Sequence, residues 1–270
     1  MNQYLHPLSA AELANFERDG FLILRSVLSG KEVEHYTRAV DGMARVFQLE
    51  NGLGEQDGVE IRNAIARSPE LLALLDHPRA LGAMEQILGW NIQLTTSHVF
   101  VRPPTPQAGA AFKSIDWHAD GPHPSFPVVH GTWPRMYAKI GYFLTDLSAP
   151  DSGNLRVIPG SHLRAQKPEP DESGEPKGAI QVLLSAGDAV LFENRTWHAV
   201  GPNYAGRARK NIYMGYCHRY LKAIDFQAQS DELMQCASPI QKQLLGACTN
   251  PLSFYLPSRY PQDTPLKPQD

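Results

Sequence analysis

A histidine and an aspartate stand two residues apart in the segment Asp116-Trp117-His118-Ala119-Asp120. In a β-strand, successive side chains point to opposite faces, so His118 and Asp120 would project from one face and converge on one point. A third ligand from another strand would complete the two-histidine, one-carboxylate set of non-haem Fe(II) oxygenases, which leaves three metal positions open. The spacing therefore predicts a metal site at His118 and Asp120.

The third ligand must come from elsewhere in a chain that contains ten histidines. His198 is our candidate, because it follows the strand-like run GDAVLF at 187–192 and a barrel can bring this segment beside residue 120. The pattern of His118 and Asp120 is common by chance when it stands alone. A histidine on an ordinary strand or surface is therefore the alternative at position 118.

Helices are expected to dominate the first 90 residues. Ser9 and Glu12 have the spacing of a capping box, which predicts a short helix that ends at Gly20. A short buried strand is expected next, at 21–24. Apolar residues at helical spacing predict further helices over 31–47, 67–76 and 79–88.

The sequence changes character after residue 91, where short runs rich in β-branched and aromatic residues alternate with Gly and Pro. The expected strands are 92–101, 114–119, 136–144, 155–158, 180–184, 188–192, 198–200 and 210–220. This pattern indicates a mainly β (α+β) fold, a sandwich or jelly-roll barrel with the N-terminal helices packed on its outer face. We expect a single domain over 1–270, with the core at about 91–220 and a late helix over 231–246.

The composition argues against several kinds of partner. The formal net charge is -3 and the pI is about 6.4, with no basic stripe of the kind that nucleic acid requires. No apolar run is long enough to span a membrane, and the N-terminus lacks the features of a secretory signal. The three cysteines form no CxxC pair, so we expect no disulfide framework, a cytoplasmic protein, and Cys217 in the core.

The order of the motifs is more specific than any one of them. The histidine-aspartate pair is followed by GNLRVIPGSH at 153–162, by GDAVLF at 187–192 and by Trp197-His198. From about Leu13 to Tyr220, this order resembles the phytanoyl-CoA dioxygenase family of Fe(II)- and 2-oxoglutarate-dependent oxygenases. The resemblance implies a double-stranded β-helix core, with Fe(II), 2-oxoglutarate and O2 as cofactor and co-substrates. It also implies the iron ligands His118, Asp120 and His198, and a structural role for His162.

The distal carboxylate of 2-oxoglutarate requires a cation, and a planar guanidinium can bind it through two hydrogen bonds. The family places an arginine about 11 residues after the distal histidine, and Arg209 has that position. Arg207 is the competitor, and for either residue a solvated loop arginine is the alternative. The strand expected at 92–101 has Thr96 and His98 on one face and Thr95 and Ser97 on the other. We expect one of these faces to border the proximal carboxylate, with Thr96 and His98 as the candidate residues.

The segment 121–135 follows the metal motif directly and is rich in proline and aromatic residues. We expect it to form a lid in which His123, Phe126 and Trp133 contact the substrate; a rigid surface loop is the alternative. Arg156 either meets an anionic substrate or points outward from its strand. Lys139 either lines the barrel mouth or points to solvent.

Together these residues predict an enzyme that hydroxylates, or otherwise oxidises, an unactivated C–H bond of a small metabolite and releases succinate and CO2. No basic cluster suits the phosphates of coenzyme A, so we expect a free small molecule, such as a natural-product intermediate. The alternatives are a non-catalytic barrel that binds a small molecule and a cupin-type metalloenzyme that does not use 2-oxoglutarate. Neither the substrate nor the oligomeric state follows from the sequence.

Overall fold

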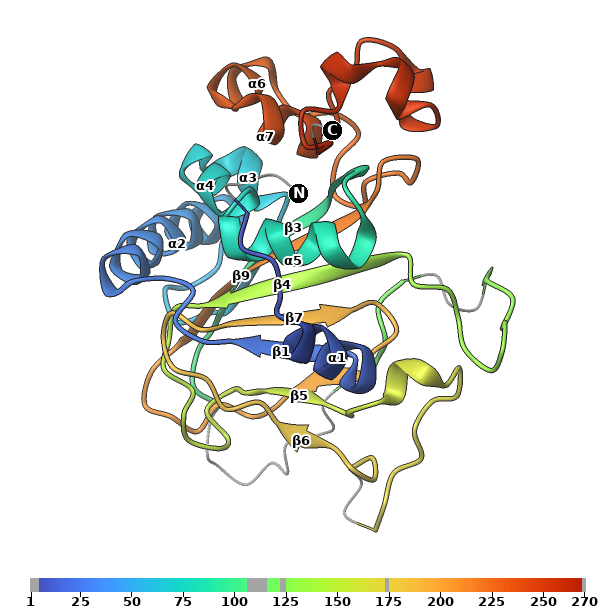
Figure 1. Cartoon of the computed structure of the whole chain (residues 1–270). Coiled ribbons are helices and arrows are strands. Elements are labelled where there is room, and N and C mark those ends of the chain that lie inside the picture. The colour runs from blue at the N-terminus through green and yellow to red at the C-terminus, as the bar shows by residue number, and fades with distance from the viewer. Residues whose placement is uncertain (1–4, 106–115, 122–124, 173–174, 269–270) are drawn as a thin grey trace.

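Two antiparallel β-sheets form the centre of the protein in the computed structural model, which describes residues 5–105, 116–121, 125–172 and 175–268 (Figure 1). The larger sheet has the strand order β1-β7-β4-β9-β3-β2, and the smaller one has the order β6-β5-β8. The strands are β1 (Phe21–Leu24), β2 (Val59–Arg62), β3 (Ile92–Arg102), β4 (Tyr137–Phe143), β5 (Leu155–Val157), β6 (Ile180–Gln181), β7 (Ala189–Glu193), β8 (His198–Val200) and β9 (Arg209–His218).

One apolar cluster lies between the two sheets and includes Leu155 and Val157 from the smaller sheet and Val190 and Phe192 from the larger one. Sequential strands alternate between the sheets in part, and all of their pairings are antiparallel. This arrangement is the predicted jelly roll, the double-stranded β-helix. The site that the sequence predicts must therefore lie between the sheets, where residues from both can meet.

Helices cover the outer face of the larger sheet, as predicted (Figure 1). They are α1 (Ala10–Asp19), α2 (Gly30–Glu50), α3 (Ala64–Arg67), α4 (Leu72–Leu75), α5 (Pro78–Leu88), α6 (Asp231–Cys236) and α7 (Pro239–Leu244). The capping box of Ser9 and Glu12 is present, and Ser29 and Glu32 form a second one at the start of α2. Among the described residues, no helix has the length and apolar character needed to cross a membrane.

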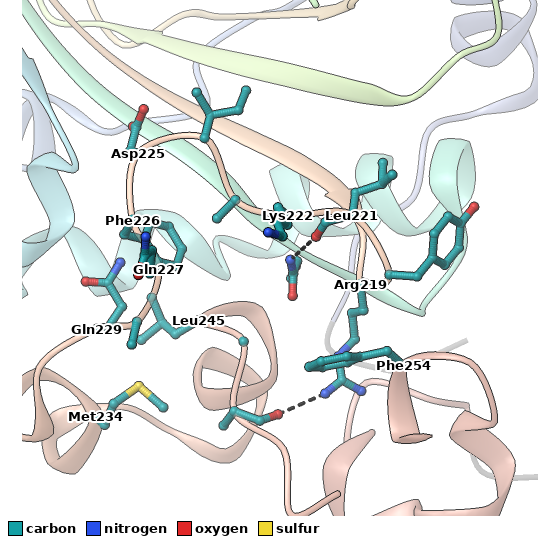
Figure 2. A pocket seen from close by; sticks show the side chains of 17 residues that line it. Arg219, Leu221, Lys222, Asp225, Phe226, Gln227, Gln229, Met234, Leu245 and Phe254 are labelled. Carbon is teal, nitrogen blue, oxygen red and sulfur yellow. Dashed lines mark hydrogen bonds between the residues drawn. The ribbon is translucent and has the colours of Figure 1, made fainter. Parts of the chain in front are cut away.

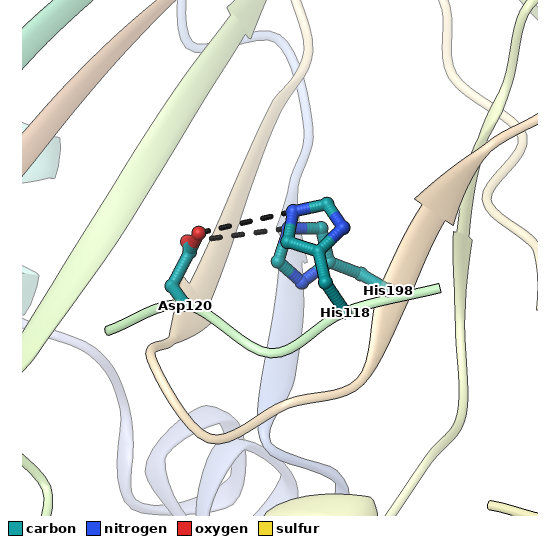
Figure 3. Close-up of side chains that lie close together, drawn as sticks. All are labelled: His118, Asp120 and His198. Carbon is teal, nitrogen blue, oxygen red and sulfur yellow. Dashed lines mark ion pairs between the residues drawn. The ribbon is translucent and has the colours of Figure 1, made fainter. Parts of the chain in front are cut away.

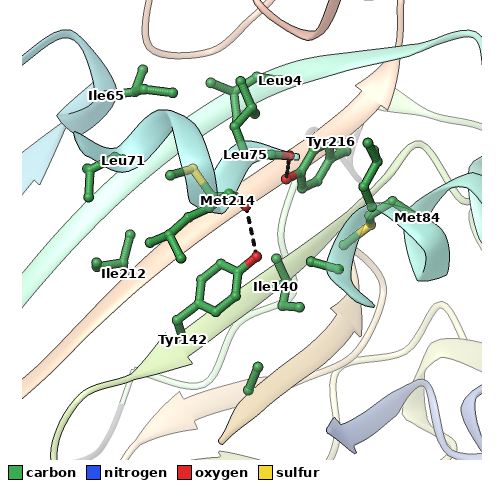
Figure 4. Close-up of a cluster of buried hydrophobic side chains, with 14 of the residues drawn as sticks. Ile65, Leu71, Leu75, Met84, Leu94, Ile140, Tyr142, Ile212, Met214 and Tyr216 are labelled. Atoms are coloured by element: carbon green, nitrogen blue, oxygen red, sulfur yellow. Dashed lines mark hydrogen bonds between the residues drawn. The ribbon is translucent and has the colours of Figure 1, made fainter. Parts of the chain in front are cut away.

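The core between helices and sheet buries two tyrosines whose hydroxyl groups are paired (Figure 4). Tyr142 donates to the carbonyl of Leu74 at 2.9 Å, and Tyr216 donates to that of Leu75 at 2.6 Å. Both carbonyls belong to the last turn of α4, which leaves them without a helical partner. The two hydroxyls thus fix a four-residue helix to strands β4 and β9.

Several predicted elements differ from those in the structure. The helix expected at 67–76 is a 3-10 turn followed by α4, and the one at 231–246 is divided before Pro239, which cannot continue a helix. Strand β2 was not predicted, because its four residues follow a polar, glycine-rich stretch. The strand expected at 114–119 is wrong over its described part: residues 116–119 contain only an isolated bridge at His118.

Gly20 joins α1 to the segment that carries His198. Its carbonyl accepts from the hydroxyl of Thr196 at 2.7 Å and from the backbone N–H of Glu193 at 3.2 Å. Its φ is +78°, and a Cβ here would lie well inside contact distance of the His162 ring and the Thr196 hydroxyl. His162 is itself buried, and its ring bonds the carbonyl of Glu17 at 3.0 Å. The close approach therefore requires glycine.

We predict that Gly20→Ala lowers the free energy of unfolding by about 2–4 kcal/mol, the sum of a strained backbone and an overpacked contact. Gly52→Ala is the matched control, because Gly52 has a φ of +66° but no atom within 4 Å of the added Cβ. Chemical denaturation of both variants measures the difference. Equal losses in the two proteins would show that the contact with His162 and Thr196 contributes nothing.

Candidate metal site

A two-residue backbone bridge brings His118 and His198 together. The N–H of His118 donates to the carbonyl of His198 at 3.0 Å, and the N–H of His198 donates to that of His118 at 2.8 Å. Residues directly opposite each other in an antiparallel pair project their side chains to the same face. The two imidazoles consequently lie side by side, with ring centroids 4.3 Å apart.

Asp120 completes the group (Figure 3). Its Oδ1 lies 3.9 Å from Nε2 of His118, and its Oδ2 lies 4.0 Å from Nε2 of His198. One candidate ligand atom from each of the three residues lies within 4.8 Å of the others. Asp120 is in a bend rather than on a regular strand, so the convergence does not arise from strand alternation as the sequence predicted.

The hydrogen bonds of the two imidazoles fix which nitrogen faces the site. Nδ1 of His118 bonds the carbonyl of Asp116 at 2.7 Å, and Nδ1 of His198 bonds the carbonyl of Thr196 at 2.9 Å. Because a carbonyl oxygen only accepts, each Nδ1 carries the proton and each Nε2 offers a lone pair. Burial lowers the pKa of His198 to about 4, so its ring is neutral near pH 7.

The side chain of Lys139 points into the barrel mouth and not to solvent: its Nζ lies 2.7 Å from Oδ2 of Asp120. Burial by itself raises the pKa of Asp120, but Lys139, together with His198 and His118, outweighs it and leaves the pKa well below its ordinary value. The carboxylate is therefore ionised near neutral pH. Two imidazoles and one carboxylate form a donor set that suits a divalent first-row metal.

A cavity of about 480 Å³ opens beside these residues, between the two sheets. It is lined by Glu60, Arg62, His98, Phe100, Arg102, Asp116, His118, Asp120, Lys139, Leu155, Phe192, His198, Val200, Arg209 and Tyr213. Arg207, Arg156, Thr96, Phe126 and Trp133 are not among its lining residues. The cavity thus joins the predicted metal group to Arg209 but to only one residue of the predicted pair on β3.

Arg209 is buried without a carboxylate partner among the described residues, and its side chain is only 1% exposed. Nη2 donates to the hydroxyl of Tyr213 at 3.3 Å, while Nε and Nη1 have no hydrogen-bond partner there. The guanidinium also lies over the ring of Phe143, at 5.4 Å. Burial lowers the pKa of Arg209, since a charge without a counter-ion is costly to bury. These free donors fit a carboxylate that enters the cavity.

The other two predicted arginines lie elsewhere. Arg207 is exposed, and its guanidinium pairs with the carboxylate of Asp146 at 3.1 Å, so this competitor for 2-oxoglutarate lies outside the cavity. Arg156 forms ion pairs with Asp151 at 3.3 Å and Glu175 at 2.6 Å. A role for Arg156 in holding an anionic substrate in the cavity has no geometric support, because two carboxylates already neutralise it.

Thr96 and His98 lie on one strand, but only His98 lines the cavity. His98 lines the cavity, and its Nε2 lies 3.2 Å from a carboxylate oxygen of Asp225. Thr96 is buried and donates to Asp225 at 2.6 Å, and Asp225 also accepts from the N–H of Ser97 at 2.9 Å. Burial raises the pKa of Asp225, but these donors, His98 first, lower it to about 2. Asp225 therefore holds His98 in place.

The described part of the expected lid does not reach the cavity. The segment makes a tight turn in which Val129 pairs with Thr132. Thr132 then donates to the carbonyl of His162 at 2.6 Å, and the carbonyl of Trp133 accepts from Arg195 at 2.9 Å. These bonds attach the end of the segment to the turn at 160–165 and to the end of β7. His123 lies outside the described residues.

Sequence reasoning missed several residues of the cavity wall. Tyr213 and Phe192 lie within predicted strands, and their alternation with core residues could have identified them. Glu60 and Arg62 could not have been found, because β2 was not predicted. Asp225, which holds His98 but is not itself part of the wall, lies in an irregular segment after β9 and gives no local signal.

A jelly roll that holds a two-histidine, one-carboxylate group beside a buried, unpaired arginine defines a class: non-haem iron enzymes that use 2-oxoglutarate. The family model of phytanoyl-CoA dioxygenase (PhyH) matches residues 16–211 of the chain. The chain therefore belongs to the phytanoyl-CoA dioxygenase family and is an iron- and 2-oxoglutarate-dependent dioxygenase.

The individual relatives and solved structures that resemble this chain share less than 30% sequence identity with it. An ectoine dioxygenase from Bordetella bronchiseptica is 27% identical over 244 residues, which cover 79% of this chain and 77% of the relative. HygX from Streptomyces hygroscopicus, solved with nickel and 2-oxoglutarate, superposes with a TM-score of 0.64 at 18% identity, covering 86% of this chain and 96% of that one. SnoK, a carbocyclase from nogalamycin biosynthesis, superposes with a TM-score of 0.58 at 22% identity, covering 78% of this chain and 85% of that one. The two solved structures share the fold of this chain.

We predict that His198→Ala weakens Fe(II) binding by more than about 100-fold, since losing even an outer partner of a ligand can cost 10–100-fold. His118→Ala and Asp120→Ala should act alike, and all three should remain folded because the site adds little to the core. His35→Ala is the control, an exposed histidine that pairs with Glu70. Calorimetric titration under anaerobic conditions, with circular dichroism, measures both effects. Wild-type affinity in His198→Ala would remove this residue from the ligand set.

Proposed function

We propose that His118, Asp120 and His198 hold Fe(II), that Arg209 binds the distal carboxylate of 2-oxoglutarate, and that the enzyme oxidises an unactivated C–H bond of a small metabolite. The observation that carries the assignment is the buried guanidinium of Arg209, with two donors unpartnered, in the same cavity as the three candidate ligands. Iron, 2-oxoglutarate and O2, when bound, would supply an oxidant: one oxygen atom of O2 would enter the succinate formed as 2-oxoglutarate loses CO2, and the other would be available to the substrate.

The protein's own residues prepare this chemistry. The carbonyls of Asp116 and Thr196 orient the two imidazoles, so that their lone pairs are available without rearrangement. Lys139 keeps the carboxylate of Asp120 ionised and turned toward the histidines. The ring of Phe192 packs against His198, with centroids 4.9 Å apart, and gives the metal group an apolar neighbour. Such a setting limits access of water to the reacting groups.

Tyr213 and His98 complete the binding surface for 2-oxoglutarate in this proposal. The hydroxyl of Tyr213 fixes the orientation of the Arg209 guanidinium, which favours a two-bond contact with a carboxylate. His98 faces the cavity from β3, the strand paired with β9 directly opposite Tyr213. We assign His98, and not Thr96, as the residue that borders the co-substrate, because His98 lines the cavity and Thr96 does not.

The lining of the cavity supports a small polar substrate. Its rim carries charges of both signs, with Arg62 paired to Glu60 at 2.9 Å, and with Arg102 and Asp116 nearby. A long acyl chain would displace water from these charges without offering them a polar group. A polar metabolite, such as a natural-product intermediate, would instead pair with them. The ectoine dioxygenases and the carbocyclase SnoK are named for small molecules or for their biosynthesis, which agrees with this substrate class.

Two alternative functions would not require features that this site has. A cupin-type enzyme that does not use 2-oxoglutarate would not need a buried cation beside its metal. A non-catalytic binding protein would not need imidazoles oriented with their lone pairs toward one carboxylate. The buried, unpartnered state of Arg209 and the orientation of the two histidines therefore favour the dioxygenase.

We predict that Arg209→Ala weakens binding of 2-oxoglutarate to the Fe(II)-loaded protein by roughly 10–150-fold, equivalent to about 1.5–3 kcal/mol for a charge-assisted contact. Arg207→Ala is the matched control and should bind as wild type does, because Arg207 lies outside the cavity. Anaerobic calorimetry gives the dissociation constants without knowledge of the substrate. If only Arg207→Ala lost affinity, the assignment would be wrong.

We also predict that His98→Phe and Asp225→Asn each weaken 2-oxoglutarate binding by about 10-fold, the scale of one lost hydrogen bond to a charged group. Because Asp225 acts through the imidazole, the double variant should bind no more weakly than His98→Phe alone. The same titration measures all three. Additive losses would mean that Asp225 and His98 act independently.

A further inference from the structure

A second cavity, of about 1040 Å³, lies between the segment 219–229 that follows β9 and the C-terminal helices (Figure 2). None of its lining residues lines the catalytic cavity. The side chains that line it include those of Arg219, Lys222, Gln229 and Phe254. Met234 of α6 lies across the cavity from Arg219 (Figure 2). No role in the proposed reaction accounts for a cavity of this size at this place.

The guanidinium of Arg219 at this cavity resembles that of Arg209. The two arginines stand at the two ends of β9, and each is only 1% exposed. In each, Nε and Nη1 have no hydrogen-bond partner among the described residues. Each also lies over a phenylalanine ring, Arg219 over Phe254 at 4.8 Å and Arg209 over Phe143 at 5.4 Å.

Nearby acceptors do not compensate the charge of Arg219. Its Nη2 donates to the carbonyl of Ala247 at 2.8 Å, which is a neutral partner. Asp225 lines the cavity, but its carboxylate bonds Thr96 and Ser97. Asp263 acts only from a distance, since its carboxylate accepts two bonds from the N–H of Thr249. Within the described part of the chain, no carboxylate forms an ion pair with Arg219.

We propose that this cavity is a second, non-catalytic binding site for a small anion, in which Arg219 binds a carboxylate or phosphate group. A buried cation without a counter-charge is unfavourable, and an anion that makes two parallel hydrogen bonds would remove that penalty. Lys222 is exposed at the same cavity and adds a second positive charge. The aromatic rings of Phe254 and Tyr220 offer apolar surface to the rest of the ligand.

The test titrates phosphate and malonate into enzyme already saturated with Fe(II) and 2-oxoglutarate under anaerobic conditions, so that the catalytic cavity is filled. We expect saturable binding of at least one anion, weakened by at least about 10-fold in Arg219→Met. Lys222→Gln should weaken it by a few-fold. Arg207→Met is the matched control, an exposed and ion-paired arginine, and should bind as wild type does.

Two arms identify the chemical source: saturation by phosphate alone indicates a phosphorylated ligand, and saturation by malonate alone indicates a carboxylic acid. Hydrogen exchange of the wild type, with and without the anion, decides the matter if Arg219→Met does not fold. Protection should then be confined to 219–229 and the helices beside it. No saturable binding, equal binding by a folded Arg219→Met, or protection only elsewhere would each overturn the proposal.

Discussion

The site depends on two backbone hydrogen bonds between His118 and His198. The segment that carries His118 and Asp120 has no regular strand structure in its described part, and this bridge ties it to β8. Because the bridge is antiparallel and sets the two residues opposite each other, both imidazoles must emerge on one side. The Nδ1 bonds to carbonyls and the pairing of Asp120 with Lys139 then refine a geometry that the backbone has already imposed.

The arginines around this bridge differ in whether a carboxylate pairs with them. Among the described residues no carboxylate pairs with Arg209 inside the cavity, whereas Arg156 and Arg207 are neutralised outside it. Glu193, which is fully buried, is bonded by Arg195 at 2.8 Å and also pairs with Arg135. This network fixes the end of β7, directly before the segment that leads to His198. Structural ion pairs therefore position the distal histidine without adding charge to the cavity.

The sequence predicted the jelly roll and the candidate ligands because both leave local signals: alternating strands between turns, and a histidine two residues from an aspartate. The resemblance to the family, which places an arginine about 11 residues after the distal histidine, indicated Arg209. The sequence could not reveal the edge strand β2 as part of the wall, or Asp225 as the residue that holds His98, because these roles arise only from pairing between distant segments. It also misjudged the environment of His118, where a single bridge replaces a strand.

Asp225 lets a distant part of the chain act on the cavity. The match to the family ends at residue 211, so the candidate ligands and Arg209 fall within the shared region, while Asp225 lies beyond it. Yet Asp225 crosses back to β3 and sets the position of His98 in the cavity. One wall of the cavity is therefore held by a part of the chain outside the region that the family model matches. A substitution in this segment can thus change the shape of the cavity while His118, Asp120 and His198 stay as they are.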